Sequence, residues 1–180
     1  MRISAFVIAI VIALCSACRN DPAKVKSYTI KDTLPFQTAT KVDLLFTDSA
    51  RVKIHLKAPL IEEFGNDNPH TILSKGVELD FFDDSGAVNT SLTAKYAIRY
   101  EREQKMEARN DVVVVNIKGE KLNTEKLIWD GIRRKIYTDA FVKITTEDQI
   151  LMGNGLESDE TFSEYEIKNL TGTILLNDGE

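Results

Sequence analysis

The chain has few side chains that could carry out chemistry. Its two histidines, His55 and His70, fall on the outward side of an expected strand and in an expected loop, and neither has partners at metal-ligand spacing. The acidic pairs Glu62-Glu63 and Asp83-Asp84 lie beside expected turns, where solvated carboxylates are far commoner than a general acid–base pair. The pattern therefore predicts no enzyme, no metal site and no cofactor.

The stretch Gly153-Asn154-Gly155 is the one glycine-rich motif that could suggest phosphate binding. A phosphate loop leads into a helix, and no helical pattern follows here. We expect these glycines to allow a β-bulge or a tight bend instead.

The two cysteines of the chain, Cys15 and Cys18, close a short apolar leader. Arg2 precedes a run over residues 3–14 that is apolar apart from Ser4, which is typical of a secretory signal and too short to span a bilayer. The sequence Ser16-Ala17-Cys18 resembles a bacterial lipobox, although Cys15 replaces the usual leucine. We therefore expect a lipoprotein signal peptide at 1–17, and acyl chains on Cys18 that attach the protein to a membrane. An ordinary signal peptide with incidental cysteines is the alternative.

The remaining composition limits the partners. Loss of the leader removes Arg2 and lowers the formal net charge from −5 to −6, which argues against nucleic acid as a partner. With no cysteine after Cys18, the mature protein can form neither a disulfide nor a thiolate metal site. A polar tether at 18–38 is expected to connect the acylated cysteine to one domain at 39–180.

Within that domain, apolar residues recur at every second position. This spacing predicts half-buried antiparallel strands joined by short turns. The alternating sets are Val42, Leu44 and Phe46, then Val52, Ile54 and Leu56, then Val77, Leu79 and Phe81. Turns are expected at 48–49 and 83–86, and a loop at 65–69. Residues 94–97 and 105–109 have helix propensity, but the turn-like break at 101–104 favours strands.

The stretch 119–139 is predicted to be a meander. Leu122 and Leu127 are five residues apart and would not share one face of a helix. As strands, Leu122 and Thr124 share one side and, after a slight break, Leu127 and Trp129 share one side. Asp130-Gly131 is a strong turn signal. The chain also repeats at 29–30 residues, so that Leu127 corresponds to Leu156 and Asp130 to Asp159. Successive strand pairs are therefore expected to be copies of one unit.

Four segments carry a resemblance to a known family. They are Asn110-Asp111-Val112-Val113-Val114, KGEKLNTEKLIWD at 118–130, GNGLESD at 153–159 and SEYEIKN at 163–169. Together, over about 40–176, they resemble the LptC family, which bridges the lipopolysaccharide (LPS) transporter to the periplasmic LPS conveyor. The conveyor shares the repeat unit, but the expected anchor favours the lipoprotein-anchored members of LptC.

The resemblance implies an all-β fold, namely an elongated, twisted antiparallel β-jellyroll that is open along one side. It implies three partners, which are LPS, the inner-membrane ABC transporter that extracts LPS, and the periplasmic conveyor. It also implies a periplasmic protein, with the lipid anchor in the inner membrane. The function expected from it is to accept LPS from the transporter and pass it to the conveyor through an apolar groove.

The same resemblance implies that the inward-facing residues contact LPS. The family pattern Gly-x-Val-x-Val points both valines inward, with Asn110 replacing the glycine here, and an aromatic residue of the YEIKN strand contacts LPS. The candidates are Val112, Val114, Leu122, Leu127, Trp129, Ile136, Val142, Ile144, Leu156, Tyr165 and Ile167. Periodicity alone favours a closed core filled by these residues, and it is the resemblance that favours a lipid groove. The alternatives are thus a scaffold lipoprotein without a lipid-carrying role, and a lipid-modifying hydrolase.

The C-terminal end is expected to offer a sheet edge. Strand-like sequence covers 164–168 and, after a break near Gly172, 173–176. An unpaired terminal strand is a template for strand addition by another β-protein. The residues assigned to this edge are Glu166, Lys168, Thr173, Ile174, Leu175 and Leu176.

Overall fold

The computed structural model describes residues 34–65 and 67–175. Its regular elements are eleven β-strands: β1 (Gln37–Asp48), β2 (Arg51–Phe64), β3 (His70–Leu73), β4 (Val77–Phe82), β5 (Val88–Ala94), β6 (Tyr96–Tyr100), β7 (Lys105–Asn116), β8 (Lys121–Asp130), β9 (Lys135–Thr145), β10 (Gln149–Asp159) and β11 (Tyr165–Leu175). The predicted all-β class is confirmed, including strands at 94–97 and 105–109 and the meander at 119–139. Within the two described ranges, no helix is long and apolar enough to cross a membrane.

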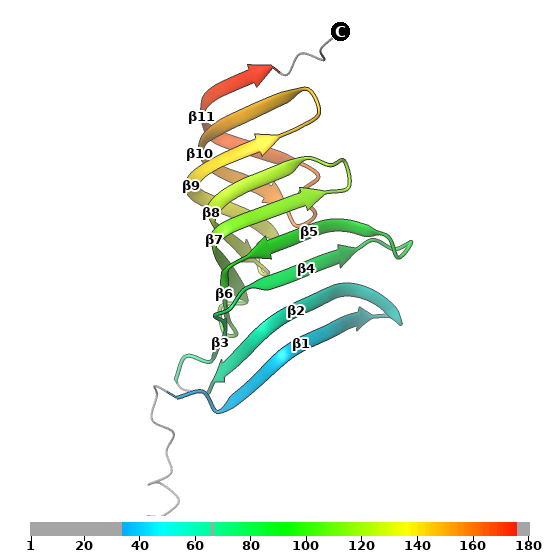
Figure 1. The fold of residues 1–180 in the computed structure, drawn as a ribbon, viewed down its shortest axis with the longest axis vertical. Helices are drawn as coiled ribbons and strands as arrows, with labels where there is room; N and C mark the ends of the chain where they lie inside the picture. The colour runs from blue at the N-terminus through cyan, green and yellow to red at the C-terminus, as the bar shows by residue number, and fades with distance from the viewer. Residues whose placement is uncertain (1–33, 66, 176–180) are drawn as a thin grey trace, which may run out of the picture. The chain divides into compact units, whose positions relative to one another are not determined.

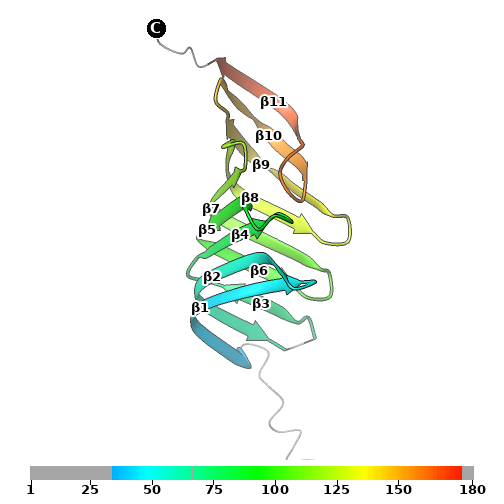
Figure 2. The same cartoon turned by 90° about the vertical axis from the view of Figure 1, so that its right-hand side faces the viewer.

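All eleven strands belong to one antiparallel sheet. Neighbours follow the order β11-β10-β9-β8-β7-β5-β4-β2-β3-β6, with β1 on β2 and a second pairing of β6 with β7. Most spatial neighbours are therefore close neighbours in the chain, and the strands stack from β1 to β11 (Figures 1 and 2). Tight turns and local pairing follow from the short polar breaks between the alternating segments.

Each long strand bends and contributes to two walls. The first half of β7, 105–109, pairs with β6, and its second half, 113–116, pairs with β5. Between the halves, Asn110 and Asp111 have φ angles of 63° and 56° and interrupt the register with β8. Asparagine and aspartate tolerate this left-handed conformation better than other non-glycine residues. Asn110 thus lies at a corner inside one strand.

The same corner recurs along the stack. The β8–β9 register shifts between Thr124 and Ile128, and the β9–β10 register shifts between Asn154 and Leu156. Gly155 lies at the second shift with φ 85°, so the bulge predicted for the glycine-rich stretch is confirmed. Because the corners align, the strands form two walls that meet along one side and, among the described residues, have no strand pairing along the other. In Figure 1, β7–β11 bend at the left of the view, next to their labels.

The 29–30-residue repeat is visible in the turns. Asp130 accepts hydrogen bonds from the amides of Ile132 and Arg133 (3.1 and 3.0 Å). Asp159 accepts hydrogen bonds from the amides of Ser163 and Glu164 (2.8 and 3.0 Å). Equivalent aspartates therefore cap the β8–β9 and β10–β11 turns.

Two sequence expectations fail at the edges of the sheet. Leu44 and Phe46 were expected to be half-buried, but they are exposed, as is Leu45 between them. Their strand β1 pairs only with β2, so β1 covers little of the interior. The expected break near Gly172 is also wrong, because β11 is one continuous strand. A register shift opposite Met152/Gly153 accommodates the irregular sequence instead.

Candidate functional site

Eight of the eleven candidate LPS contacts are buried between the two walls. They are Val112, Val114, Leu122, Leu127, Ile136, Val142, Ile144 and Leu156. They come from four adjacent strands, β7 to β10, and pack in one hydrophobic cluster. Direct pairing brings Leu122 opposite both Val114 and Ile144, which places all three on the same face. This interior is therefore continuous along the stack and filled by its own side chains.

The other three candidates lie at the margin of the cluster. Tyr165 and Ile167 of the edge strand β11 are half-buried against it. Trp129 is 37% exposed, although it pairs with the buried Ile136 and so lies on the inward face. Ile128 pairs with Tyr137 on the opposite face. The predicted faces agree with the register, and contact of these residues with lipid stays a prediction.

The interior is closed on its unpaired side by the β10–β11 turn, which the sequence reading missed. Phe162 in this turn is completely buried, with φ 54°, and stacks on Tyr165 at 5.0 Å between ring centroids. The carbonyl of Thr161 accepts a hydrogen bond from the Thr90 hydroxyl (2.7 Å). The carbonyl of Phe162 accepts one from the Asn116 side-chain amide (3.1 Å). In the sequence, a single phenylalanine among polar turn residues was the only indication that this turn packs against the interior.

Asp159 shapes this turn. Burial opposes its ionisation and is the largest single influence on the pKa. Hydrogen bonds from the Glu164 amide, the Thr161 and Ser163 hydroxyls and the Ser163 amide outweigh that influence and lower the pKa to about 2. The carboxylate is therefore ionised at neutral pH and organises the chain on both sides of Phe162.

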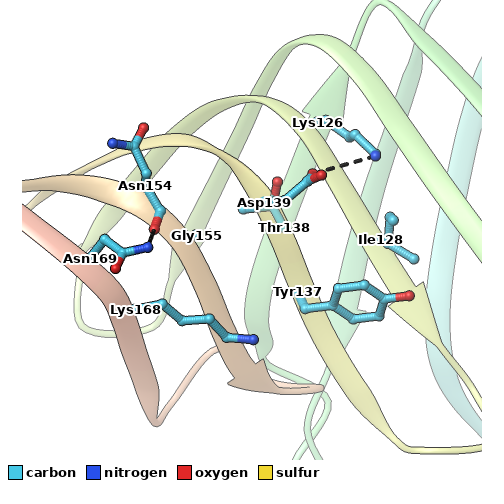
Figure 3. A pocket seen from close by; sticks show the side chains of 9 residues that line it. All are labelled: Lys126, Ile128, Tyr137, Thr138, Asp139, Asn154, Gly155, Lys168 and Asn169. Atoms are coloured by element: carbon cyan, nitrogen blue, oxygen red, sulfur yellow. Dashed lines mark hydrogen bonds and ion pairs between the residues drawn. The ribbon is translucent and has the colours of Figure 1, made fainter.

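A hollow of about 300 Å³ lies on the outward face of β8–β11 (Figure 3). It is lined by Lys126, Ile128, Tyr137, Thr138, Asp139, Asn154, Gly155, Lys168 and Asn169. The ammonium of Lys126 lies 3.4 Å from the Asp139 carboxylate, and that of Lys168 lies 3.5 Å from the carboxylate of Glu157. This hollow therefore lies outside the apolar interior, and both of its lysines are held in ion pairs.

The remaining polar candidates serve structural roles. His55 lies on β2 and its Nε2 is 2.6 Å from a carboxylate oxygen of Asp43 on β1. His70 was expected in a loop, but it begins β3 and stacks on Phe64 at 4.8 Å. Strand pairing with β2 and β6 and this ring contact together order the residue. Among the described residues, no group of three His, Cys, Asp or Glu could hold a metal ion.

The acidic pairs show no catalytic arrangement either. Asp83 accepts hydrogen bonds from the Ser85 hydroxyl and the amides of Ser85 and Ala87, which lower its pKa. Asp84 lies 2.5 Å from the Lys53 ammonium. Glu62 accepts a hydrogen bond from the Ser74 hydroxyl (3.1 Å). These carboxylates therefore support turns and strand contacts.

The predicted docking edge is an edge of the sheet. β11 pairs only with β10, so its other side has no strand partner among the described residues. Glu166 and Lys168 are exposed on the outward face, and Leu175 is 72% exposed at the end of the strand. Leu176 and the expected lipid-attachment residue Cys18 lie outside the described residues.

Comparison with known proteins gives one family. The family model described as "Lipopolysaccharide-assembly, LptC-related" matches residues 6–175 of this chain. A search of curated proteins finds no match.

Proposed function

Because this chain belongs to the LptC-related lipopolysaccharide-assembly family, we propose that it accepts LPS from the inner-membrane ABC transporter and passes it to the periplasmic conveyor through its apolar interior. The family forms a transport bridge and is not an enzyme family, and it is periplasmic and associated with the inner membrane. For this chain we propose a non-enzymatic carrier, attached to the membrane by lipid on Cys18.

The observation that carries the proposal is the unbroken apolar interior between the walls of β7 to β11. Its members come from every strand of that stack, from Val112 on β7 to Ile167 on β11. Binding acyl chains requires only apolar area and shape, at about 0.8 kcal/mol for each methylene removed from water. No nucleophile or base is needed, since ATP hydrolysis in the transporter supplies the energy.

The sheet edges support a direction of transfer. β11 offers an unpaired strand for the conveyor to extend the sheet and align its interior with this one. The end of the stack that contains β1 would face the transporter, and its exposed Leu44, Leu45 and Phe46 provide apolar area there. Lipid could then pass along one protein interior without meeting water.

One observation favours a rival function. The deepest candidates, among them Val112, Val142 and Leu156, have no exposed surface in this structure. A closed core of this kind suits a scaffold lipoprotein that holds other proteins together. The two functions differ in whether the protein carries lipid.

Mass spectrometry of lipids that co-purify with the full-length chain tests the proposal. We expect LPS with the wild type and with Glu166→Gln, which alters the outward face. Ile167→Gln, which places an amide on the inward face one residue away, should reduce the LPS recovered. Absence of LPS from the wild type, or equal recovery with both variants, would support the scaffold function instead.

A further inference from the structure

We propose that the Phe162 ring is a removable plug that fills an acyl-chain site in the lipid-free protein, and that LPS expels the β10–β11 turn when it loads. This inference rests on the proposed function and specifies where the lipid enters. It also assigns Thr90 and Asn116 as the residues that hold the plug in place.

The position of Phe162 is unusual for a turn residue. Its neighbours Thr161 and Ser163 are polar, yet its own side chain is completely buried and packs in the hydrophobic cluster of the two walls. The ring stacks on Tyr165, a candidate LPS contact, with 13° between the ring planes. Because protein interiors are close-packed, a ring in this position and an acyl chain beside Tyr165 exclude each other.

Few interactions hold the turn across the opening. It crosses from the wall that ends in β10 to the wall formed by β5 and β7, where Thr90 pairs with Asn116. Two neutral hydrogen bonds make this crossing, from the Thr90 hydroxyl and from the Asn116 amide. Both end on backbone carbonyls of the turn, Thr161 and Phe162, so neither belongs to the strand ladder.

The turn can therefore leave without unpairing a strand. β10 pairs with β11 from Ser158 and Tyr165 onwards, and residues 160–164 lie outside that ladder. Phe162 also adopts φ 54°, which non-glycine residues hold only when their surroundings support it. An acyl chain that takes the place of the ring would bury apolar area similar to what the ring loses, so the apolar burial is nearly unchanged and the main cost is the loss of the hydrogen bonds and the ion pair of the turn.

The molecule contains its own reporter for this movement. Trp129 is the only tryptophan, and its indole N–H donates to the Glu160 carboxylate in the same turn (3.0 Å). Glu160 also pairs with Arg134 at 2.9 Å. Expulsion of the turn separates Glu160 from the indole and should change the Trp129 emission.

Hydroxyl-radical footprinting of the full-length chain tests whether the plug moves. The protein is freed of lipid by detergent exchange and then titrated with lipid A in mixed micelles. We expect the oxidation of Phe162 to rise several-fold with lipid A, together with a shift in Trp129 emission. Leu156, which is equally buried but belongs to a strand, serves as the internal reference and should stay protected.

A matched pair of threonine variants tests whether the Thr90 hydrogen bond holds the plug in place. Thr90→Val removes the hydrogen bond to the turn and keeps the side-chain shape. Thr124→Val removes a similar buried hydroxyl, which donates to the Phe141 carbonyl (2.8 Å) at a strand corner. Because the plugged state lowers the apparent affinity, loss of the Thr90 hydrogen bond should tighten lipid A binding about two- to tenfold. Thr124→Val should bind as the wild type does, and circular dichroism should show both variants folded.

The outcomes separate the plug from the proposed function. Exposure of Phe162 with lipid A and tighter binding by Thr90→Val support the plug. A lipid-bound protein in which Phe162 stays as protected as Leu156, or equal affinities of the two threonine variants, overturns the plug and leaves the carrier function standing. Failure of the wild type and both variants to bind lipid A overturns both.

Discussion

Replacement of Gly153 by alanine tests the close approach of β10 and β11 at the corner of the sheet. A Cβ at this position would lie 2.5 Å from the backbone oxygen of Asn169 and 3.1 Å from its carbonyl carbon, and would overlap the side chain of Ile167. The first distance is roughly 1 Å short of an ordinary van der Waals contact. Because the obstruction is backbone, β11 must shift as a strand.

The expected cost follows from this geometry. Overpacking a tight site costs about 1–3 kcal/mol, and the backbone clash places Gly153→Ala in the upper half of that range. The lower entropy of the unfolded alanine variant offsets about 0.5–1 kcal/mol. We expect a net loss of about 2 kcal/mol in the free energy of unfolding. With an m-value of about 2 kcal/mol per molar urea, the midpoint should fall by about 1 M.

Urea titration followed by circular dichroism and by Trp129 emission measures this loss. Coincident transitions from the two probes would justify the two-state treatment. Gly172→Ala is the matched control, because a Cβ there meets only the flexible end of Met152, at 3.3 Å. Its midpoint should stay within about 0.3 M of the wild type, which corresponds to about 0.5 kcal/mol. A Gly153→Ala midpoint equal to that of the control would refute the close strand approach.

Three further predictions concern the turn, the anchor and the edge. The lowered pKa of Asp159 means that its stabilising effect is complete above about pH 5 and is lost as the pH falls towards 2. Asp159→Asn should therefore lower the free energy of unfolding at pH 7 by about 1 kcal/mol, and this difference should shrink in urea titrations at pH 2.5. Cys18→Ala should release the protein from membranes or leave its leader uncut. Unchanged acylation of this variant in fractionated cells would exclude Cys18 as the lipid-attachment residue. Glu166→Pro should weaken conveyor binding in a pull-down while the transporter is still recovered, because the register places the Glu166 N–H in the ladder with Glu157 of β10 and its loss distorts the edge strand; wild-type conveyor binding by this variant and by a chain truncated after Asn169 would exclude the edge.

Much of the fold could be predicted because its signals are local. The alternation around Leu127 and the turn at Asp130-Gly131 act within a few residues, and the structure confirms both. The glycine bulge could be predicted for the same reason, since only a special backbone conformation explains glycine at a position such as Gly155. The repeat then extends these assignments to the other strands.

The failures depend on contacts that are distant in the sequence. The exposure of Phe46 follows from the edge position of β1, which alternation does not reveal. The burial of Phe162 depends on Thr90 and Asn116, which are 71 residues from Thr161 and 46 residues from Phe162 respectively. His70 lies in a strand because it pairs with both β2 and β6, of which β6 is distant in the sequence. Sequence spacing identifies which residues alternate, but not which surface covers them.

The deepest part of the candidate site could be identified only as a set of inward residues. Burial of Leu122 or Val142 fits a closed core as well as a lipid path, because both need apolar side chains between the walls. The margin residues are more informative. Tyr165 and Ile167 are half-buried at an unpaired strand, where lipid could leave for a neighbouring sheet.

Photo-crosslinking in living cells tests the central claim most directly. A photoreactive side chain replaces Tyr165 on the inward face of β11, or Glu166 next to it on the outward face, and captured LPS is detected on the purified protein. The carrier function predicts capture at Tyr165 that depends on ATP hydrolysis by the transporter, and none at Glu166. Equal capture at the two positions, or no capture at Tyr165 in cells that export LPS, would contradict an interior path for the lipid.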